Sequence, residues 1–224
     1  MRADTQRLAA YAGLSGVLLL AICCTLPAWF YHGQAGEVFS FLNHFMSELG
    51  LYRVSSWAVV FNSGLFIGGG LLLVSLLGVG LQFRSRLGWA ATACGVLTGV
   101  ACALLGFFPL NRLALHLSLA YTFFCGWPLT VFLFSLLLGR QSRTRFTRPL
   151  QLLGGVSAVL FLVFLALPFL YGLQRLWSLD LRHVVRPPFL FPALLEWLMF
   201  FSVLGWTTLA CVHLLRQRQP VQPS

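Results

Sequence analysis

The segment WAVVFNSGLFIGGGLLLVSLLGVG, residues 57–80, contains no charged side chain. A helix needs about 20 mostly apolar residues to cross the hydrocarbon core of a bilayer, and this segment is long enough. Five further windows of this kind lie along the chain, at residues 8–30, 88–108, 113–138, 150–171 and 189–215. Lipid offers the backbone no hydrogen-bond partners, so each window has to cross as a helix. The sequence therefore predicts an all-α polytopic membrane bundle with six transmembrane helices.

The composition excludes the main alternatives. Hydrophobic residues make up 58 % of the chain and charged residues 9 %, whereas charged residues are about 25 % of a soluble domain. A disordered chain would in turn be far less apolar. Only two connections are long, residues 31–56 and 172–188, which leaves no room for a soluble domain. We therefore expect residues 1–224 to form a single transmembrane domain.

The positive charge predicts orientation. The formal net charge is +10, and arginines near helix ends mark the cytoplasmic side. Ten of the fifteen arginines flank the helix ends that share a side with both termini, namely Arg2, Arg7, Arg84, Arg86, Arg140, Arg143, Arg145, Arg148, Arg216 and Arg218. We therefore expect both termini in the cytoplasm, in the cell membrane and specifically the inner membrane of a bacterium. Because these arginines flank spans rather than form a groove, we expect no nucleic-acid partner.

Small residues recur every three or four positions along residues 88–106, including Gly95, Gly99 and Gly106. A second group, at residues 64–70, lies in the preceding span. Such stripes allow helix backbones to approach closely. We expect these two helices to pack together and to lie centrally in the bundle.

Ionisable and amide side chains inside spans are costly and often functional. Asn62 lies early in its span, His116 follows the start of the fourth span, and Glu196 lies early in the last span. All three fall in the outer half of the predicted membrane. The inner half holds little comparable polarity.

The two long outer connections read as interfacial helices. In VFSFLNHFMSELGLY, residues 38–52, apolar residues repeat at helical spacing, and His44, Ser47 and Glu48 fall on the other face. The second connection, LQRLWSLDLRHVVRPPF, shows a similar pattern over residues 173–189.

Together these residues predict an outward-facing polar pocket. Its candidate residues are His44, Ser47, Glu48, Asn62, His116 and Glu196, with Asp180, Arg182 and His183 at the rim. Each also has a purely structural interpretation. His44 and His183 would be interfacial residues, His116 would bind a backbone carbonyl at a helix end, and Glu196 would pair with an arginine.

Four short motifs occur in order in this chain: Ser-Glu-Leu-Gly at 47–50, Phe-Asn-Ser-Gly at 61–64, Gly-Phe-Phe-Pro at 106–109, and His116 followed by Phe123-Phe124. They resemble the prokaryotic six-helix membrane family catalogued as domain of unknown function 998, over about residues 8–215. A weaker likeness to DRAM and Sfk-type membrane proteins implies lipids rather than small solutes as ligands. The family has no agreed activity, so the resemblance supplies a fold and site candidates without a reaction.

The sequence favours a membrane protein that binds or senses a lipid or small amphiphile, with membrane lipids as partners and no cofactor or metal. One alternative is a metal-dependent intramembrane lipid hydrolase, in which Ser47, Glu48 and histidines including His44, His116 and His183 would surround zinc. No His-x-x-x-His pair supports it, so binding is favoured over enzymatic activity. A small-solute transporter is a second alternative, which the apolar inner half disfavours.

Overall fold

The computed structural model describes residues 3–33, 35–141, 147–170 and 187–216. The elements in chain order are α1 (Ala3–Thr25), η1 (Leu26–Phe30), η2 (Met46–Gly50), α2 (Ala58–Gly80), α3 (Arg86–Phe107), η3 (Leu110–Arg112), α4 (Leu113–Gln141), α5 (Thr147–Leu170) and α6 (Phe191–Arg216). The long elements are α-helices and the η elements are short 3-10 turns. The described part of the chain contains no β-strand beyond an isolated bridge between His32 and Val38.

Six helices are long and apolar enough to cross a membrane, which confirms the predicted fold class. Their bounds agree with the predicted windows to within a few residues at most ends. The first span differs in one respect, because α1 gives way at Thr25 to the 3-10 turn η1. Pro27 lies in this turn and cannot donate a backbone hydrogen bond within a continuing α-helix. The protein is an integral membrane protein.

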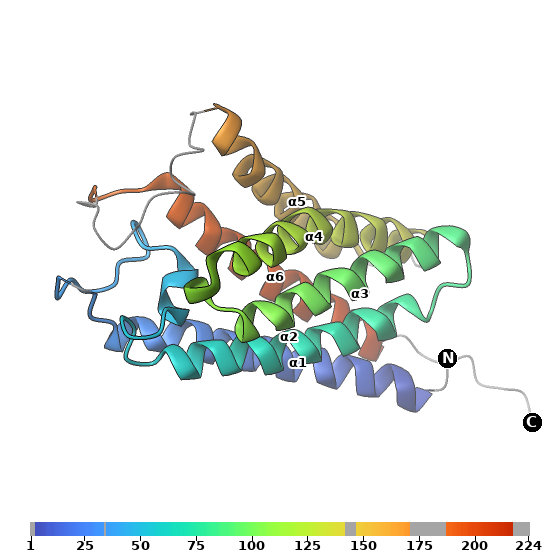
Figure 1. Cartoon of the computed structure of the whole chain (residues 1–224). Coiled ribbons are helices and arrows are strands. Elements are labelled where there is room, and N and C mark those ends of the chain that lie inside the picture. The colour runs from blue at the N-terminus through green and yellow to red at the C-terminus, as the bar shows by residue number, and fades with distance from the viewer. Residues whose placement is uncertain (1–2, 34, 142–146, 171–186, 217–224) are drawn as a thin grey trace, which may run out of the picture.

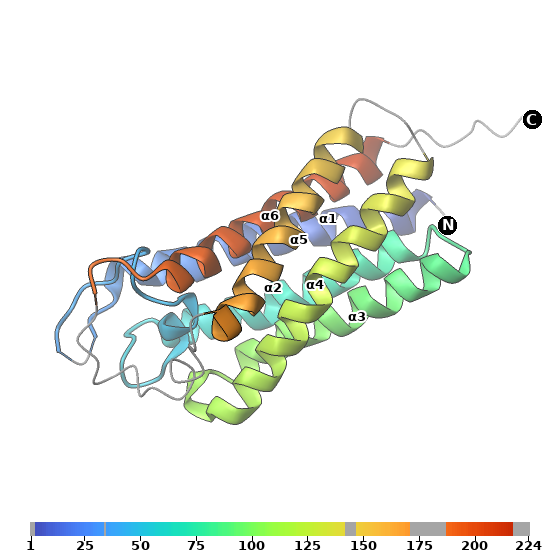
Figure 2. The ribbon, with the colours of Figure 1, turned by 90° about the horizontal axis from the view of Figure 1, so that it is seen from above.

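The helices form a ring in which each packs against its neighbours in the sequence, and α1 closes the ring against α6 (Figures 1 and 2). Residues 31–33, 35–57 and 108–112 lie at one end, which we call the loop end (Figure 1). The start of α1 and the end of α6 lie at the opposite end of the bundle, which we call the terminal end (Figure 1). The first and the last of the six described spans therefore have these ends on the same side of the bundle.

Glycines bring α2 and α3 into close contact. A Cβ at Gly69 would lie 2.6 Å from the backbone nitrogen of Ala103, and a Cβ at Gly99 would lie 2.8 Å from Cα of Leu73. This contact confirms the predicted packing of the two small-residue stripes. The two helices are well buried, at 50 % and 56 % of their apolar windows, and α6 is buried slightly more, at 61 %. In a ring of six, large residues such as Trp197 and Trp206 of α6 fill the interior.

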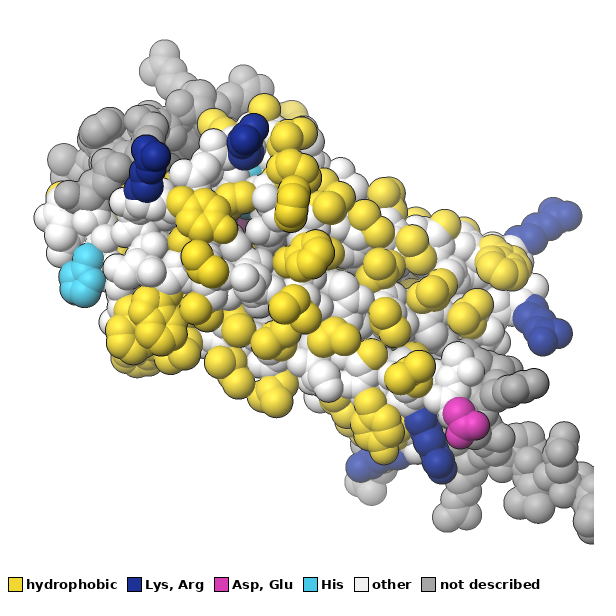
Figure 3. Space-filling model, turned by 60° about the horizontal axis from the view of Figure 1, so that its bottom comes forward, with side chains coloured by type: hydrophobic (Ala, Val, Ile, Leu, Met, Phe, Trp, Pro, Cys, Tyr) yellow, Lys and Arg dark blue, Asp and Glu magenta, His cyan; other side chains and the backbone are white. Residues whose placement is uncertain are grey.

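The outside of the bundle suits lipid. Apolar side chains spread along the length of the visible face, and arginines lie only towards its two ends (Figure 3). On α5, Leu152, Val156 and Leu162 are each more than half exposed.

The first long loop is not the amphipathic helix that its spacing predicts. Residues 40–43 form a turn, and only Met46–Gly50 is helical, as the 3-10 element η2. The predicted apolar face is divided, since Val38 is 71 % exposed while Leu49 is fully buried. The Glu48 carboxylate accepts a hydrogen bond from the Phe45 backbone N–H, and this cap starts the helical turn at Met46 rather than near residue 38. The second predicted interfacial helix lies outside the described residues.

Candidate functional site

A cavity of about 70 Å³ lies inside the bundle. It is several times larger than the roughly 10–15 Å³ that one water molecule requires. Every transmembrane helix and the turn η2 contribute to its wall. The lining residues are Leu20, Met46, Ser47, Phe61, Leu65, Cys102, Leu105, His116, Ala120, Phe123, Phe124, Phe161, Glu196, Met199, Phe200 and Val203. The wall is therefore apolar except for the side chains of Ser47, His116 and Glu196 and the weakly polar thiol of Cys102.

Glu196 reaches the cavity from the first turns of α6 and is only 8 % exposed. One carboxylate oxygen accepts a hydrogen bond of 2.7 Å from the backbone N–H of Met46. This bond ties α6 to the start of η2 across a sequence distance of 150 residues. Within the described part of the chain, it is the one hydrogen bond recorded for the Glu196 side chain. The predicted arginine partner is not seen among these residues.

Glu48 lies beside this contact and is 2 % exposed. Its Oε1 accepts a hydrogen bond of 2.8 Å from the backbone N–H of Phe45. This is the reach-back half of a capping box, in which an acidic residue caps the start of its own turn. Glu48 does not line the cavity. Its carboxylate fixes the turn that delivers Ser47 and Met46 to the cavity wall.

His116 lies near the start of α4 and is 7 % exposed. Its Nδ1 lies 2.9 Å from the carbonyl oxygen of Phe108. A carbonyl only accepts, so Nδ1 carries the hydrogen, and in the neutral imidazole Nε2 is left as an acceptor. The contact matches the structural interpretation of His116 as a helix-end residue bound to a carbonyl. The same residue also lines the cavity, so the two roles coexist.

Asn62 is buried outside the cavity lining. Its Nδ2 donates a hydrogen bond of 2.9 Å to the carbonyl oxygen of Gly50. A Cβ at Gly50 would collide with Oδ1 of Asn62, so the loop approaches α2 at a position that only glycine allows. The Phe-Asn-Ser-Gly and Ser-Glu-Leu-Gly motifs therefore meet through Asn62 and Gly50.

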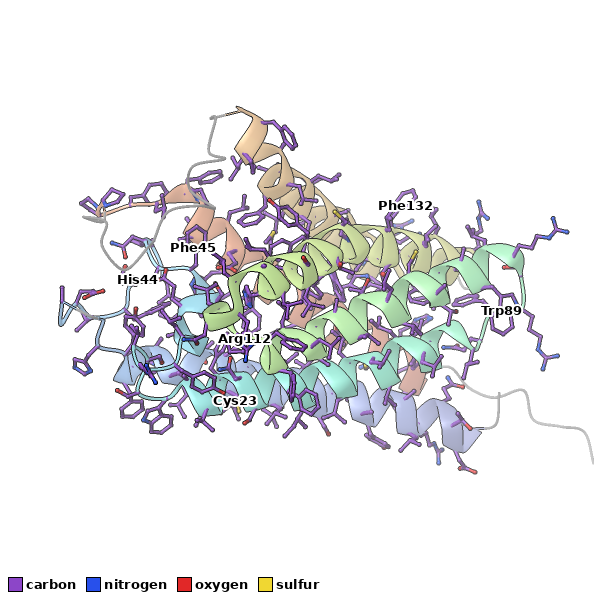
Figure 4. All side chains as sticks on the ribbon, in the orientation of Figure 1. Cys23, His44, Phe45, Trp89, Arg112 and Phe132 are labelled. Carbon is purple, nitrogen blue, oxygen red and sulfur yellow. The ribbon has the colours of Figure 1, made fainter. Side chains whose placement is uncertain are left out.

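His44 is also buried but does not line the cavity. Its ring packs against Phe39, with 4.9 Å between centroids, and against Tyr31 at 5.5 Å. Its backbone carbonyl accepts a hydrogen bond of 3.2 Å from Nε1 of Trp197. In Figure 4, the labelled His44 and Phe45 lie at the loop end, opposite Trp89. His44 thus belongs to the aromatic packing that joins the first loop to α6.

The structure therefore divides the predicted pocket residues into two groups. Ser47, His116 and Glu196 share the cavity, whereas His44, Glu48 and Asn62 hold the first loop against the helices. Asp180, Arg182 and His183 lie outside the described residues.

Sequence reasoning missed the aromatic part of the wall, formed by Phe123, Phe124 and Phe161, whose centroids lie about 6 Å apart across α4 and α5. The Phe pair after His116 was a visible signal for two of them. Phe161 lies in a uniformly apolar span in which nothing distinguishes it.

Among the described residues, no group of three or more His, Cys, Asp or Glu side chains is placed to hold a metal ion. His44 and His116 serve different sites, one in the loop packing and one at the cavity. The structure therefore offers no assembled zinc site from the described members of the predicted set.

The family model described as "Protein of unknown function (DUF998)" matches residues 16–213, which include all four motifs. No curated protein and no solved structure matches this chain. The likeness to DRAM and Sfk-type proteins stays a prediction.

Proposed function

The chain belongs to the DUF998 family of unknown function, and we propose from its cavity that it binds an amphiphile, with the polar end of the ligand among Ser47, His116 and Glu196. Small-molecule sites are typically apolar cavities with a few convergent polar groups, and this cavity has that composition. An amphiphile has a polar end and an apolar chain, so it can match both the polar and the apolar parts of this wall. The observation that carries the proposal is the presence of two buried ionisable side chains, His116 and Glu196, in one otherwise apolar wall.

The position of the cavity favours a ligand taken from the membrane. Its lining comes from transmembrane helices that are apolar on the outside as well. The polar members of the wall lie near the loop end, since Ser47 is in η2 and His116 and Glu196 are near the starts of their helices. With both termini in the cytoplasm, as the arginine distribution favours, the ligand would come from the outer leaflet of the cell membrane.

The volume of the cavity limits what enters. At about 70 Å³ it suits a polar end group and the first carbons of a chain rather than a whole phospholipid. No observation among the described residues specifically favours the hydrolase or the transporter.

The test is saturable binding of 1-monolauroylglycerol to the purified full chain in phosphatidylcholine nanodiscs, measured with radiolabelled probe and corrected for empty nanodiscs. Wild type should bind saturably. Ala120→Leu places a larger side chain in the cavity wall and should abolish binding, because Ala120 lines it and is 6 % exposed. Gly155→Leu is the matched control, since a Cβ there meets nothing within 4 Å, and it should bind as wild type does. Equal binding by the two variants would refute the proposed site.

A further inference from the structure

The polar groups of the cavity are unbalanced in their hydrogen-bonding capacity. Glu196 in its ionised form only accepts, and one of its oxygens is engaged by Met46. Neutral His116 presents Nε2, also an acceptor, because Nδ1 donates to Phe108. Ser47 can donate or accept. The wall therefore offers acceptors in excess of donors.

Backbone donors at the turn do not restore the balance. The N–H groups of Phe45 and Met46 are both engaged by carboxylates, from Glu48 and Glu196. These amides are the donors that would otherwise be available to an anionic ligand at the start of η2. Each is already occupied by a carboxyl oxygen of the protein itself.

No cationic side chain lines the cavity within the described residues. Arg112, labelled in Figure 4, follows the Gly-Phe-Phe-Pro motif on η3 near the loop end, but it is solvent-exposed and does not belong to the wall. An anionic group in this cavity would have no positive charge beside it, and a buried unpaired charge is strongly unfavourable.

The aromatic part of the wall gives a second, independent reason to expect a positively charged ligand. Phe123 and Phe124 of α4 and Phe161 of α5 line the same cavity. The face of an aromatic ring attracts a cation and gains nothing from an anion. The rings and the carboxylate thus favour the same sign of ligand charge.

On the premise that the cavity binds an amphiphile, we propose that its preferred ligand is a long-chain primary amine in its ammonium form, followed by a hydroxyl-ended amphiphile, and that phosphate- and carboxylate-ended amphiphiles are excluded. An ammonium group carries three donors. Glu196, Nε2 of His116 and the hydroxyl of Ser47 supply three acceptors for them. A hydroxyl group supplies one donor and lacks the charge, which makes it the weaker ligand.

The experiment compares dodecylamine, 1-dodecanol and dodecyl phosphate as probes of the full chain in phosphatidylcholine nanodiscs, with binding to empty nanodiscs subtracted for each. Wild type should bind dodecylamine at least about tenfold more tightly than dodecanol, the difference expected for one hydrogen bond to a charged group. Dodecyl phosphate should show no saturable binding. This ranking is measured on the unaltered protein, so it does not depend on any variant folding.

Glu196→Gln tests the source of the preference. It should weaken dodecylamine binding by about tenfold or more and leave dodecanol binding within a few-fold of wild type. Glu37→Gln is the matched control, because it removes the same charge from the first loop, where the Glu37 carboxylate binds only the local amide of Ala35 among its recorded hydrogen bonds. Its dodecylamine affinity should match wild type.

The experiment distinguishes a failure of the amine preference from a failure of amphiphile binding itself. Dodecyl phosphate binding as tightly as dodecylamine, or unchanged dodecylamine binding by Glu196→Gln, would overturn the amine preference while leaving amphiphile binding intact. Absence of saturable binding for all three probes would overturn amphiphile binding itself.

Discussion

Glu48 and Glu196 accept hydrogen bonds from adjacent backbone amides, those of Phe45 and Met46, at 2.8 and 2.7 Å. One carboxylate belongs to the turn itself and the other comes from α6. The start of η2 is therefore held between a local cap and a long-range contact. Because Ser47 is the next residue, this pair of bonds determines where the loop enters the cavity wall.

The Glu196 contact should be measurable as stability. Glu196→Gln keeps an amide oxygen that can accept from Met46, so the variant should unfold close to wild type. Glu196→Ala leaves that partly buried N–H without its protein partner and should lower the free energy of unfolding by about 1 kcal/mol. Thermal unfolding in a mild detergent measures both. Equal midpoints for Glu196→Ala and wild type would show that the bond contributes nothing.

Gly50 and Asn62 should be energetically coupled. Gly50→Ala introduces a Cβ that collides with Oδ1 of Asn62 and lies 2.9 Å from the ring of Phe61, so it should destabilise the protein. Asn62→Ala removes one of the two obstacles and also the bond to the Gly50 carbonyl. In a double-mutant cycle, the destabilisation of the double variant should be smaller than the sum of the single effects by about 0.5 kcal/mol or more. Additive effects on the free energy of unfolding would show that the two residues are not energetically coupled.

Two adjacent glycines of α2 should respond differently to the same substitution. Gly69→Ala places a Cβ 2.6 Å from the Ala103 backbone, whereas a Cβ at Gly70 meets nothing within 4 Å. Gly69→Ala should therefore separate α2 from α3 and lower the unfolding temperature. Gly70→Ala should be neutral or slightly stabilising, because alanine favours helix by up to about 1 kcal/mol over glycine. A loss of stability in Gly70→Ala equal to that in Gly69→Ala would contradict the packing.

Trp197 should control the order of the first loop. Trp197→Phe keeps an aromatic ring but loses the Nε1–H that donates to the carbonyl of His44. Hydrogen exchange should become faster over residues 40–46, because fewer contacts then oppose local opening. Trp89→Phe provides the control, since Trp89 is 60 % exposed at the terminal end (Figure 4). Unchanged hydrogen exchange in Trp197→Phe would show that this bond does not order the first loop.

The spans were predictable because lipid imposes one simple requirement, a long apolar helix, and each window satisfies it independently. The contact of α2 with α3 was also visible, since glycine spacing reports backbone approach directly. The first loop was not predictable in this way. Its apolar residues do repeat at helical spacing. That spacing does not reveal the hydrogen bond between Phe45 and the Glu48 carboxylate or the packing of Phe41 against Trp197.

The candidate site was predictable in part. The cost of burying Glu196 and His116 marked them as residues with a specific environment, and both line the cavity. The sequence could not separate them from Asn62, which is equally polar and equally deep, because only the fold decides that Asn62 faces the Gly50 carbonyl instead. The aromatic wall needed the structure for the same reason, since Phe161 is one apolar residue among many in α5.

The most direct test of amphiphile binding at this site is photolabelling. A hydroxyl-ended amphiphile with a diazirine beside the polar group is bound to the full chain in nanodiscs, crosslinked by light and located by peptide mass spectrometry. We expect saturable labelling at cavity residues such as Glu196, His116 and Phe123. Unlabelled 1-monolauroylglycerol should compete with it, and Ala120→Leu should abolish it. Labelling confined to lipid-facing residues such as Leu152, without saturation or competition, would contradict amphiphile binding at this site.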